Sequence, residues 1–175
     1  AKQTVSENGT YQFRVTDAAG NMTSKSIKIT NIDKVAPTLE ITGYSGTWTN
    51  ENIVLTATAD EGTIEYFDGT EWIVGDSLTV SENGTYQFRV TDKAGNITEK
   101  SVVVDKIDKV APTMAISANT TAWTNQDVIL TAAVSDGFVE FYNGTEWIAG
   151  AKQTVSENGT YQFRVTDAAG NMTSK

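Results

Sequence analysis

The sequence predicts an all-β protein built from tandem β-sandwich domains, with no helix longer than a single turn. A segment of 13 residues, VSENGTYQFRVTD, begins at Val5 and occurs again at Val80 and Val155, at a constant offset of 75 residues. Strand-like segments separated by turn residues recur about every 8–12 residues, a spacing typical of β-sandwiches. No window carries the sustained apolar stripe that an amphipathic helix requires.

The offset of 75 residues divides the chain into three parts. Aligning residues 34–100 with 109–175 needs no gap and gives 39 identities in 67 positions. The Ala-Pro pair that ends at Pro37 marks the start of a repeat, because proline cannot donate a hydrogen bond to a strand ladder. We therefore expect residues 1–33 to be the C-terminal strands of a preceding repeat, 34–108 to be a complete repeat, and 109–175 to be a repeat lacking its last strand.

Two explanations of the incomplete last repeat remain open. The sequence is either a segment of a longer array, which we favour, or neighbouring chains complete one another by strand donation. Residues 1–25 are identical to residues 151–175. This identity predicts an array in which two repeat types alternate every 150 residues.

The central repeat is expected to contain seven strands. Alternation of apolar and polar residues places Leu55 and Phe88 inward and Arg89 outward. Asn-Gly and Asp-Gly pairs, as at Asn83-Gly84, mark the turns between strands. The expected strands, in order, are residues 38–42, 53–59, 64–67, 71–74, 78–80, 86–91 and 102–104.

Composition excludes several function classes. The chain has no cysteine and no histidine, which excludes disulfides and zinc–cysteine sites and removes the commonest general base. Its net charge of −9 disfavours nucleic acid and anionic membranes as partners and suits cations. No run approaches the roughly 18 apolar residues of a spanning helix. We expect no nucleic-acid partner, no membrane insertion of this segment, and any export signal to lie outside it.

Five short motifs, in the same order in both repeats, carry a family resemblance. They are Val-Ala-Pro-Thr, Trp-Thr-Asn, Gly-Thr-Glu-Trp, Glu-Asn-Gly-Thr-Tyr and Thr-Asp-x-Ala-Gly-Asn. Together they resemble bacterial immunoglobulin-like (Ig-like) repeats, which form long arrays in adhesins and other surface proteins. The resemblance implies Ig-like topology, a place on the bacterial cell surface, and the role of a stalk or beaded fibre rather than an enzyme.

The same resemblance implies partners. Each repeat would contact neighbouring copies head to tail, and any host or matrix ligand would bind elsewhere in the full protein. The linker at residues 105–110 has no flexible Gly/Ser run, so we expect its bending to be restricted.

Acidic residues at the repeat junctions are candidates for calcium binding. In an Ig-like sandwich the linker and two loops meet at one pole, and oxygen ligands gathered there suit a hard cation. The alternative, which we favour, is that the aspartate of the Asp-x-Ala-Gly-Asn turn caps that turn. Replacement of Asp60 by Ser135 in the next repeat weakens the metal hypothesis. The candidates are Asp33, Asp60, Glu61 and Asp92 at one junction, and Asp108, Asp136 and Asp167 at the next.

The four tryptophans also recur with the repeat. They could form a sugar-stacking platform, but we favour burial in a small core without disulfides, because a tryptophan buries a large area. Trp72 is expected to face inward together with Val74. The four residues are Trp48, Trp72, Trp123 and Trp147.

Other candidate chemistry has a simpler interpretation. The Asn-Gly-Thr sequences at Asn8, Asn83, Asn143 and Asn158 match the glycosylation pattern, but Asn-Gly is also a hairpin signal, which we favour. Lysines that could form isopeptide bonds have no obvious buried asparagine partner; they are Lys2, Lys25 and Lys28. A carboxylate pair, Glu65 and Glu71, is expected on a solvated face without a pocket.

The rival function is an adhesive module that binds carbohydrate or protein through its loops. The two repeats differ most at residues 43–47 against 118–122, and at 58–64 against 133–139. A single ligand that every copy recognises identically would not use those loops.

Overall fold

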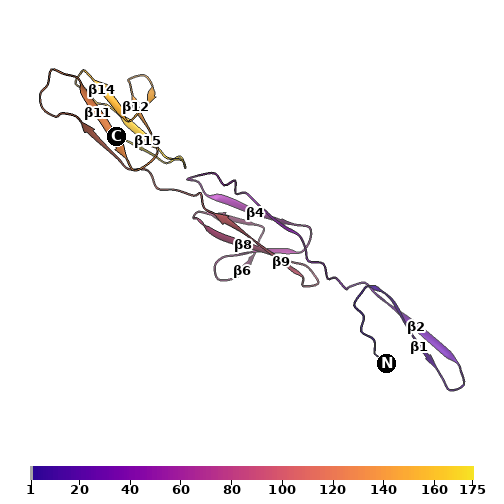
Figure 1. Ribbon diagram of the computed structural model, residues 1–175. Helices are drawn as coiled ribbons and strands as arrows, with labels where there is room; N and C mark the ends of the chain where they lie inside the picture. The colour runs from indigo at the N-terminus through magenta and orange to yellow at the C-terminus, as the bar shows by residue number, and fades with distance from the viewer. Residues whose placement is uncertain (1) are drawn as a thin grey trace. The chain divides into compact units, whose positions relative to one another are not determined.

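The computed structural model describes residues 2–175. These residues form 16 strands and no helix, which confirms the predicted all-β fold class (Figure 1). Accordingly, this part of the chain has no helix that could cross a membrane. The strands are β1 (Gly9–Thr16), β2 (Met22–Ile29), β3 (Leu39–Thr42), β4 (Ile53–Ala59), β5 (Thr63–Phe67), β6 (Trp72–Val74), β7 (Ser77–Val80), β8 (Gly84–Thr91), β9 (Ile97–Val104), β10 (Met114–Ala118), β11 (Val128–Val134), β12 (Phe138–Tyr142), β13 (Trp147–Ala149), β14 (Lys152–Val155), β15 (Phe163–Thr166) and β16 (Met172–Ser174).

The first part of the chain is an antiparallel hairpin. Strands β1 and β2 pair from Gly9 opposite Ile29 to Thr16 opposite Met22. The alternating pattern puts Phe13 and Val15 on one face, where they are 43% and 67% exposed. Their counterparts in the other repeats are fully buried, because there the remaining strands of a sandwich cover them.

The central and last repeats each contain a three-stranded and a four-stranded sheet. In the central repeat the strand orders are β3-β4-β7 and β6-β5-β8-β9, and in the last repeat they are β10-β11-β14 and β13-β12-β15-β16. Two antiparallel sheets of this kind, each with an apolar inner face, are the arrangement of an Ig-like sandwich. The buried side chains of the central repeat come from both sheets; they include Leu39, Leu55, Val80, Phe88, Val90 and Val104.

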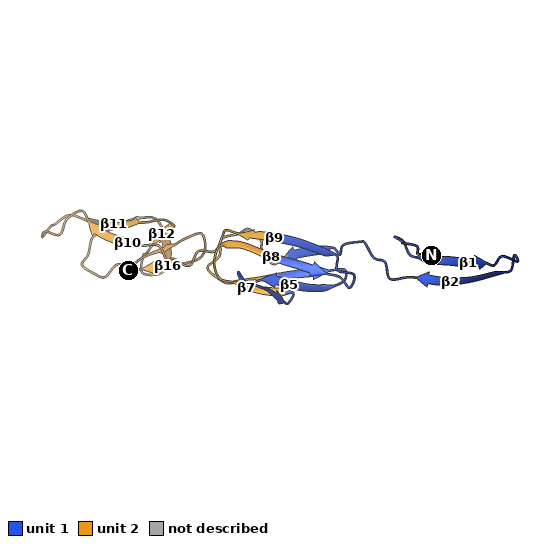
Figure 2. Cartoon of the chain, turned by 90° about the horizontal axis from the view of Figure 1, so that it is seen from below, with its two compact units in different colours: residues 1–41, 56–76, 87–101 blue, residues 42–55, 77–86, 102–175 orange. Residues whose placement is uncertain are grey.

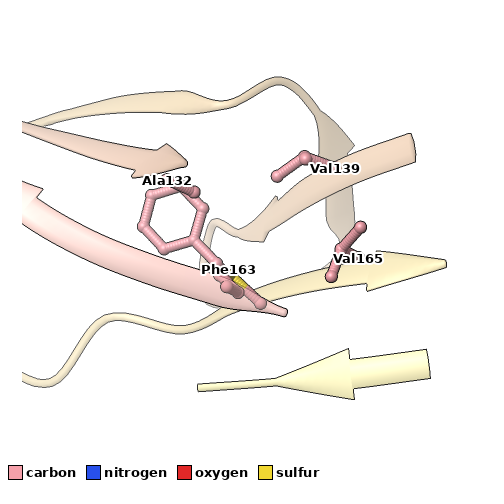
Figure 3. Close-up of a cluster of buried hydrophobic side chains, with 5 residues drawn as sticks. Ala132, Val139, Phe163 and Val165 are labelled. Carbon is pink, nitrogen blue, oxygen red and sulfur yellow. The ribbon is translucent and has the colours of Figure 1, made fainter. Parts of the chain in front are cut away.

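The core of the last repeat lies around the Phe163 ring. Phe163 and Val165, two residues apart on β15, are fully buried, and they pack with Met114, Ala132 and Val139 from strands β10, β11 and β12. Figure 3 shows the Phe163 ring beside Ala132, with Val139 and Val165 on neighbouring strands. The inward phase predicted for this segment from its alternation therefore holds.

The chain separates into two compact units (Figure 2). One unit comprises residues 1–41, 56–76 and 87–101, and the other comprises residues 42–55, 77–86 and 102–175. The boundary passes through β4, β8 and β9 and does not follow the 75-residue repeat. Repeat boundaries at residues 34 and 109 therefore remain a prediction from the sequence.

The last strand of each repeat begins earlier than expected. Strand β9 starts at Ile97, directly after the turn, rather than near Val102. The last repeat therefore contains the first three residues of this strand as β16, which pairs with β15 from Arg164 opposite Ser174 to Thr166 opposite Met172. Strand β15 has four residues, whereas its counterpart β8 has eight.

Truncation of Phe163 tests the position of this core. Phe163→Ala should lower the free energy of unfolding by about 3–5 kcal/mol, since the side chain is fully buried and its removal leaves a cavity. Urea denaturation followed by circular dichroism measures the change. Phe13→Ala is the matched control, because Phe13 lies in the same 13-residue sequence but is 43% exposed. Equal losses for the two variants would contradict this assignment of the core.

Candidate metal site and inter-repeat junction

The Asp-x-Ala-Gly-Asn turn has the same internal hydrogen bonds in all three repeats. In the central repeat, Oδ1 of Asp92 accepts from the Asn96 backbone N–H at 2.8 Å, and Oδ2 accepts from the Asn96 side chain at 2.7 Å. Gly95 adopts a φ of 90°, in the left-handed region that glycine occupies without strain. Asp17 binds Asn21, and Asp167 binds Asn171, in the same way.

These hydrogen bonds set the charge state of the turn aspartates. The Asn96 side chain, followed by backbone N–H groups of the turn, lowers the pKa of Asp92 below its usual range, although desolvation acts in the opposite direction. The pKa of Asp17 is lowered by the equivalent Asn21 hydrogen bonds. Asp17 has no acidic cluster around it in residues 2–175, so the turn alone accounts for this aspartate.

Three of the predicted calcium ligands lie together at the first junction. Carboxylate oxygens of Asp33, Glu61 and Asp92 lie within 4.8 Å of one another; Asp92 is buried and the other two are exposed. Their chemistry suits a hard cation. However, both oxygens of Asp92 already accept hydrogen bonds from Asn96, so the turn engages the innermost ligand.

Asp60 has a separate structural role outside this cluster. Its Oδ1 accepts from the backbone N–H of Thr38 at 2.8 Å, which is also the main cause of its lowered pKa. In the last repeat Ser135 accepts from the N–H of Thr113 at 3.0 Å. The replacement of aspartate by serine at this position therefore preserves a backbone cap, whether or not a metal binds.

The structure does not bring together the acidic residues predicted for the second junction. Asp167 caps its turn, and Asp108 accepts from the N–H of Val110 at 2.9 Å. Within residues 2–175, Asp108, Asp136 and Asp167 do not form a three-carboxylate cluster.

An asparagine in the turn before β8 holds the linker that leaves the central repeat. The Asn83 side chain donates to the Ile107 carbonyl at 2.8 Å and accepts from the Ile107 N–H at 2.8 Å. A carboxamide carries the same donor and acceptor as a peptide group, so this pair resembles one rung of a strand ladder. Asn8 and Ile32 form the same pair, at 2.8 and 2.9 Å. We call this pair the asparagine clamp.

The following repeat holds the next residues of the linker. The Asn171 side chain donates to the Asp108 carbonyl at 2.9 Å, and Thr173 donates to the Pro112 carbonyl at 2.6 Å. Asn96 and Thr98 bind the Asp33 and Pro37 carbonyls in the same way, at 3.3 and 2.5 Å. The turn asparagine thus serves both its own aspartate and the incoming linker.

The Trp-Thr-Asn loop also contacts the linker. Thr49 forms a parallel bridge with Ile107, receiving a hydrogen bond from the Asp108 N–H and donating one to the Lys106 carbonyl, both at 2.9 Å. The Asn50 N–H donates to the Ala169 carbonyl at 3.1 Å. Ile107 is 7% exposed. The linker is therefore an ordered, hydrogen-bonded segment, as its lack of glycine and serine indicates.

Residues 38–106 match the family model of a bacterial Ig-like domain. The match covers 69 of the 175 residues and includes both sheets of the central repeat. No curated protein matches the chain. This match supports the Ig-like resemblance of the motifs, and families of this kind are modules of surface proteins and are typically not enzymes.

The prediction that all four tryptophans anchor the core of the Ig-like domains is wrong. Trp48 is 46% exposed and Trp123 is fully exposed. Trp72 and Trp147 are half-buried but lie on outer sheet faces, under Arg89 and Arg164, whose guanidinium carbons are each 4.4 Å from a ring centroid. The pairing of Phe67 with Trp72 sets this phase, so that Ile73 rather than Trp72 faces inward, and Val74 is exposed.

The structure also shows where the remaining candidate residues lie. Glu65, expected on a solvated face, forms an ion pair with Arg89 at 2.7 Å across the sheet. Asn143 accepts from the N–H groups of Thr145 and Glu146 at 2.9 Å, in agreement with the hairpin-turn interpretation of Asn-Gly. The isopeptide candidates Lys2, Lys25 and Lys28 are exposed.

The asparagine clamp predicts unequal effects for two matched substitutions. Asn83→Ala should destabilise the protein by about 1–3 kcal/mol, because it leaves the Ile107 N–H and carbonyl without partners. Hydrogen exchange at the Ile107 amide should accelerate. Asn158→Ala is the control, since within residues 2–175 the Asn158 side chain makes no hydrogen bond. Unchanged exchange at Ile107 in Asn83→Ala would contradict the clamp.

Lowered aspartate pKa values predict loss of stability in acid. A carboxyl whose pKa is lower in the folded state stabilises the fold above its unfolded value, near 3.8, and this contribution disappears as pH falls through the folded pKa. The melting temperature should therefore fall below about pH 4. Scanning calorimetry from neutral to strongly acidic pH measures it. A melting temperature that rises over this range would contradict the assignment.

A calcium titration decides between the turn and the metal hypotheses. Because the turn accounts for Asp92, we expect equal melting temperatures in calcium and in a calcium chelator. The Asp33→Asn variant is the control, since it removes a ligand without touching the turn. A calcium-dependent rise that Asp33→Asn abolishes would establish a metal site at the first junction.

Proposed function

We propose that this chain is a structural segment of a stalk or fibre in an extracellular bacterial surface protein, in which Ig-like repeats contact one another head to tail. The observation that carries the proposal is the linker. Lys106, Ile107 and Asp108 each form backbone hydrogen bonds with loops before or after them in the chain. Consecutive linker residues bound on both sides suit a role in transmitting force and limiting bending.

Contacts at the start of the linker support the same proposal. The Tyr44 hydroxyl donates to the Asp105 carboxylate, which raises the pKa of Tyr44, and the Asp105 N–H donates back to the hydroxyl at 3.2 Å. Lys106 lies over the Trp48 ring, 4.7 Å from its centroid, and Lys109 donates to Asn52 at 2.6 Å. The loop at residues 44–52 thus supports the linker along its length.

The exposure of Trp123 favours a second candidate function, a carbohydrate- or protein-binding module. Trp123 directly follows residues 118–122, one of the two segments in which the repeats differ most. However, its counterpart Trp48 packs under a linker lysine, which is a structural role. Quenching of tryptophan fluorescence by an oligosaccharide, lost in Trp123→Ala, would favour the binding module; no quenching is expected from a stalk.

Small-angle scattering on arrays of increasing length tests the stalk proposal. With ordered linkers, the maximum dimension should grow in proportion to the number of repeats, whereas flexible linkers give growth close to the square root of that number. Arrays that carry Asn-to-Ala substitutions at every asparagine clamp should grow less steeply. Square-root growth in the unmodified array would overturn the proposal.

A further inference from the structure

Three asparagines share the same local sequence but differ in their surroundings. Asn8, Asn83 and Asn158 each precede a glycine within the repeated 13-residue segment. Two hydrogen bonds hold each of the first two carboxamides, to Ile32 and to Ile107. Within residues 2–175 the Asn158 side chain makes none. Any chemical difference among the three must therefore come from tertiary contacts rather than from neighbouring residues.

Asn-Gly pairs can undergo deamidation without a catalyst. The glycine backbone nitrogen attacks Cγ of the asparagine, the Cγ–Nδ2 bond breaks, and ammonia leaves with the proton of the glycine N–H. Water then opens the cyclic imide and leaves aspartate or its β-linked isomer. Water is consumed and ammonia is released, so no other reactant is needed. Glycine permits this reaction because it has no side chain to hinder the approach of its nitrogen.

We infer that Asn83 is a latent deamidation site that the asparagine clamp protects and that becomes reactive when the linker detaches. Both Oδ1 and Nδ2 of Asn83 are bound to Ile107 at 2.8 Å. The carboxamide cannot turn its Cγ toward the Gly84 nitrogen without breaking both hydrogen bonds. Asn8 is protected by the same geometry, whereas in the 175-residue protein the Asn158 side chain has no such hydrogen bonds and is the unprotected comparison.

Deamidation would change the hydrogen bonding of the junction irreversibly. Aspartate at position 83 can still accept from the Ile107 N–H, but it has no N–H for the Ile107 carbonyl and places a negative charge beside it. A junction that opens and reacts would therefore not close again in its original form. This inference depends on the clamp geometry and not on the proposed cell-surface role.

Incubation of the 175-residue protein at mildly alkaline pH tests the inference. Cleavage after glutamate releases fragments 8–40, 83–99 and 158–175, each beginning at the asparagine in question and sharing its first ten residues. Mass spectrometry then follows deamidation at each site separately. We expect Asn83 and Asn8 to react roughly 10- to 100-fold more slowly than Asn158, because two hydrogen bonds must open first.

Unfolding and matched variants provide the controls. In concentrated urea the three rates should converge, since the local sequences are identical. Ile107→Ala, which weakens packing of the linker, should accelerate reaction at Asn83 alone, and Ile32→Ala at Asn8 alone. Gly159→Ala should suppress reaction at Asn158; its new Cβ would lie 3.6 Å from the nearest atoms of Tyr161, so the substitution fits.

Each outcome decides the inference. Slower reaction at Asn8 and Asn83 in the folded protein, together with convergence in urea, supports it. Equal rates in the folded protein overturn it, as does a difference that persists in urea. If a linker variant fails to fold, as circular dichroism would show, the comparison of the three sites in the unmodified protein still decides.

Discussion

The carboxamide of one turn asparagine determines how the linker leaves each repeat. Asn83 gives Ile107 both a donor and an acceptor, so the linker gains the equivalent of a strand partner at the point where the sheet ends. With Ile107 fixed and buried, Asp108 lies beside Thr49 and Asn171, which bind its N–H and its carbonyl. The Asn83–Ile107 pair thus acts together with these contacts to order the junction.

The turn after β8 combines two tasks in five residues. Its aspartate and glycine form the tight turn, while the side chain of its asparagine binds both that aspartate and the carbonyl of the preceding linker. In the N-terminal hairpin Asn21 binds Asp17 in the same way, although Asp17 has no acidic neighbours within the described residues, so the turn alone accounts for this aspartate. An acidic residue that recurs at a junction is therefore, on its own, weak support for a metal site.

The outer faces of the four-stranded sheets carry a second repeated arrangement. Glu65, Arg89 and Trp72 form an ion pair and a cation–π contact across three strands, and Glu140, Arg164 and Trp147 repeat it. The arginine covers the aromatic ring while its charged end remains paired. A small domain without disulfides thereby covers large apolar rings that its narrow core does not contain.

The sequence predicted the all-β class, the inward phase of Phe88 and Phe163, and the turns. These features depend on exact repetition, on alternation and on local turn chemistry. The outward position of Trp72 could not be predicted from the sequence. A three-residue strand such as β6 has too little alternation to fix its phase, and pairing with Phe67 decides it. The asparagine clamp also required the tertiary structure. Asn83 and Ile107 are 24 residues apart, and only the folded sandwich brings a turn residue beside the linker.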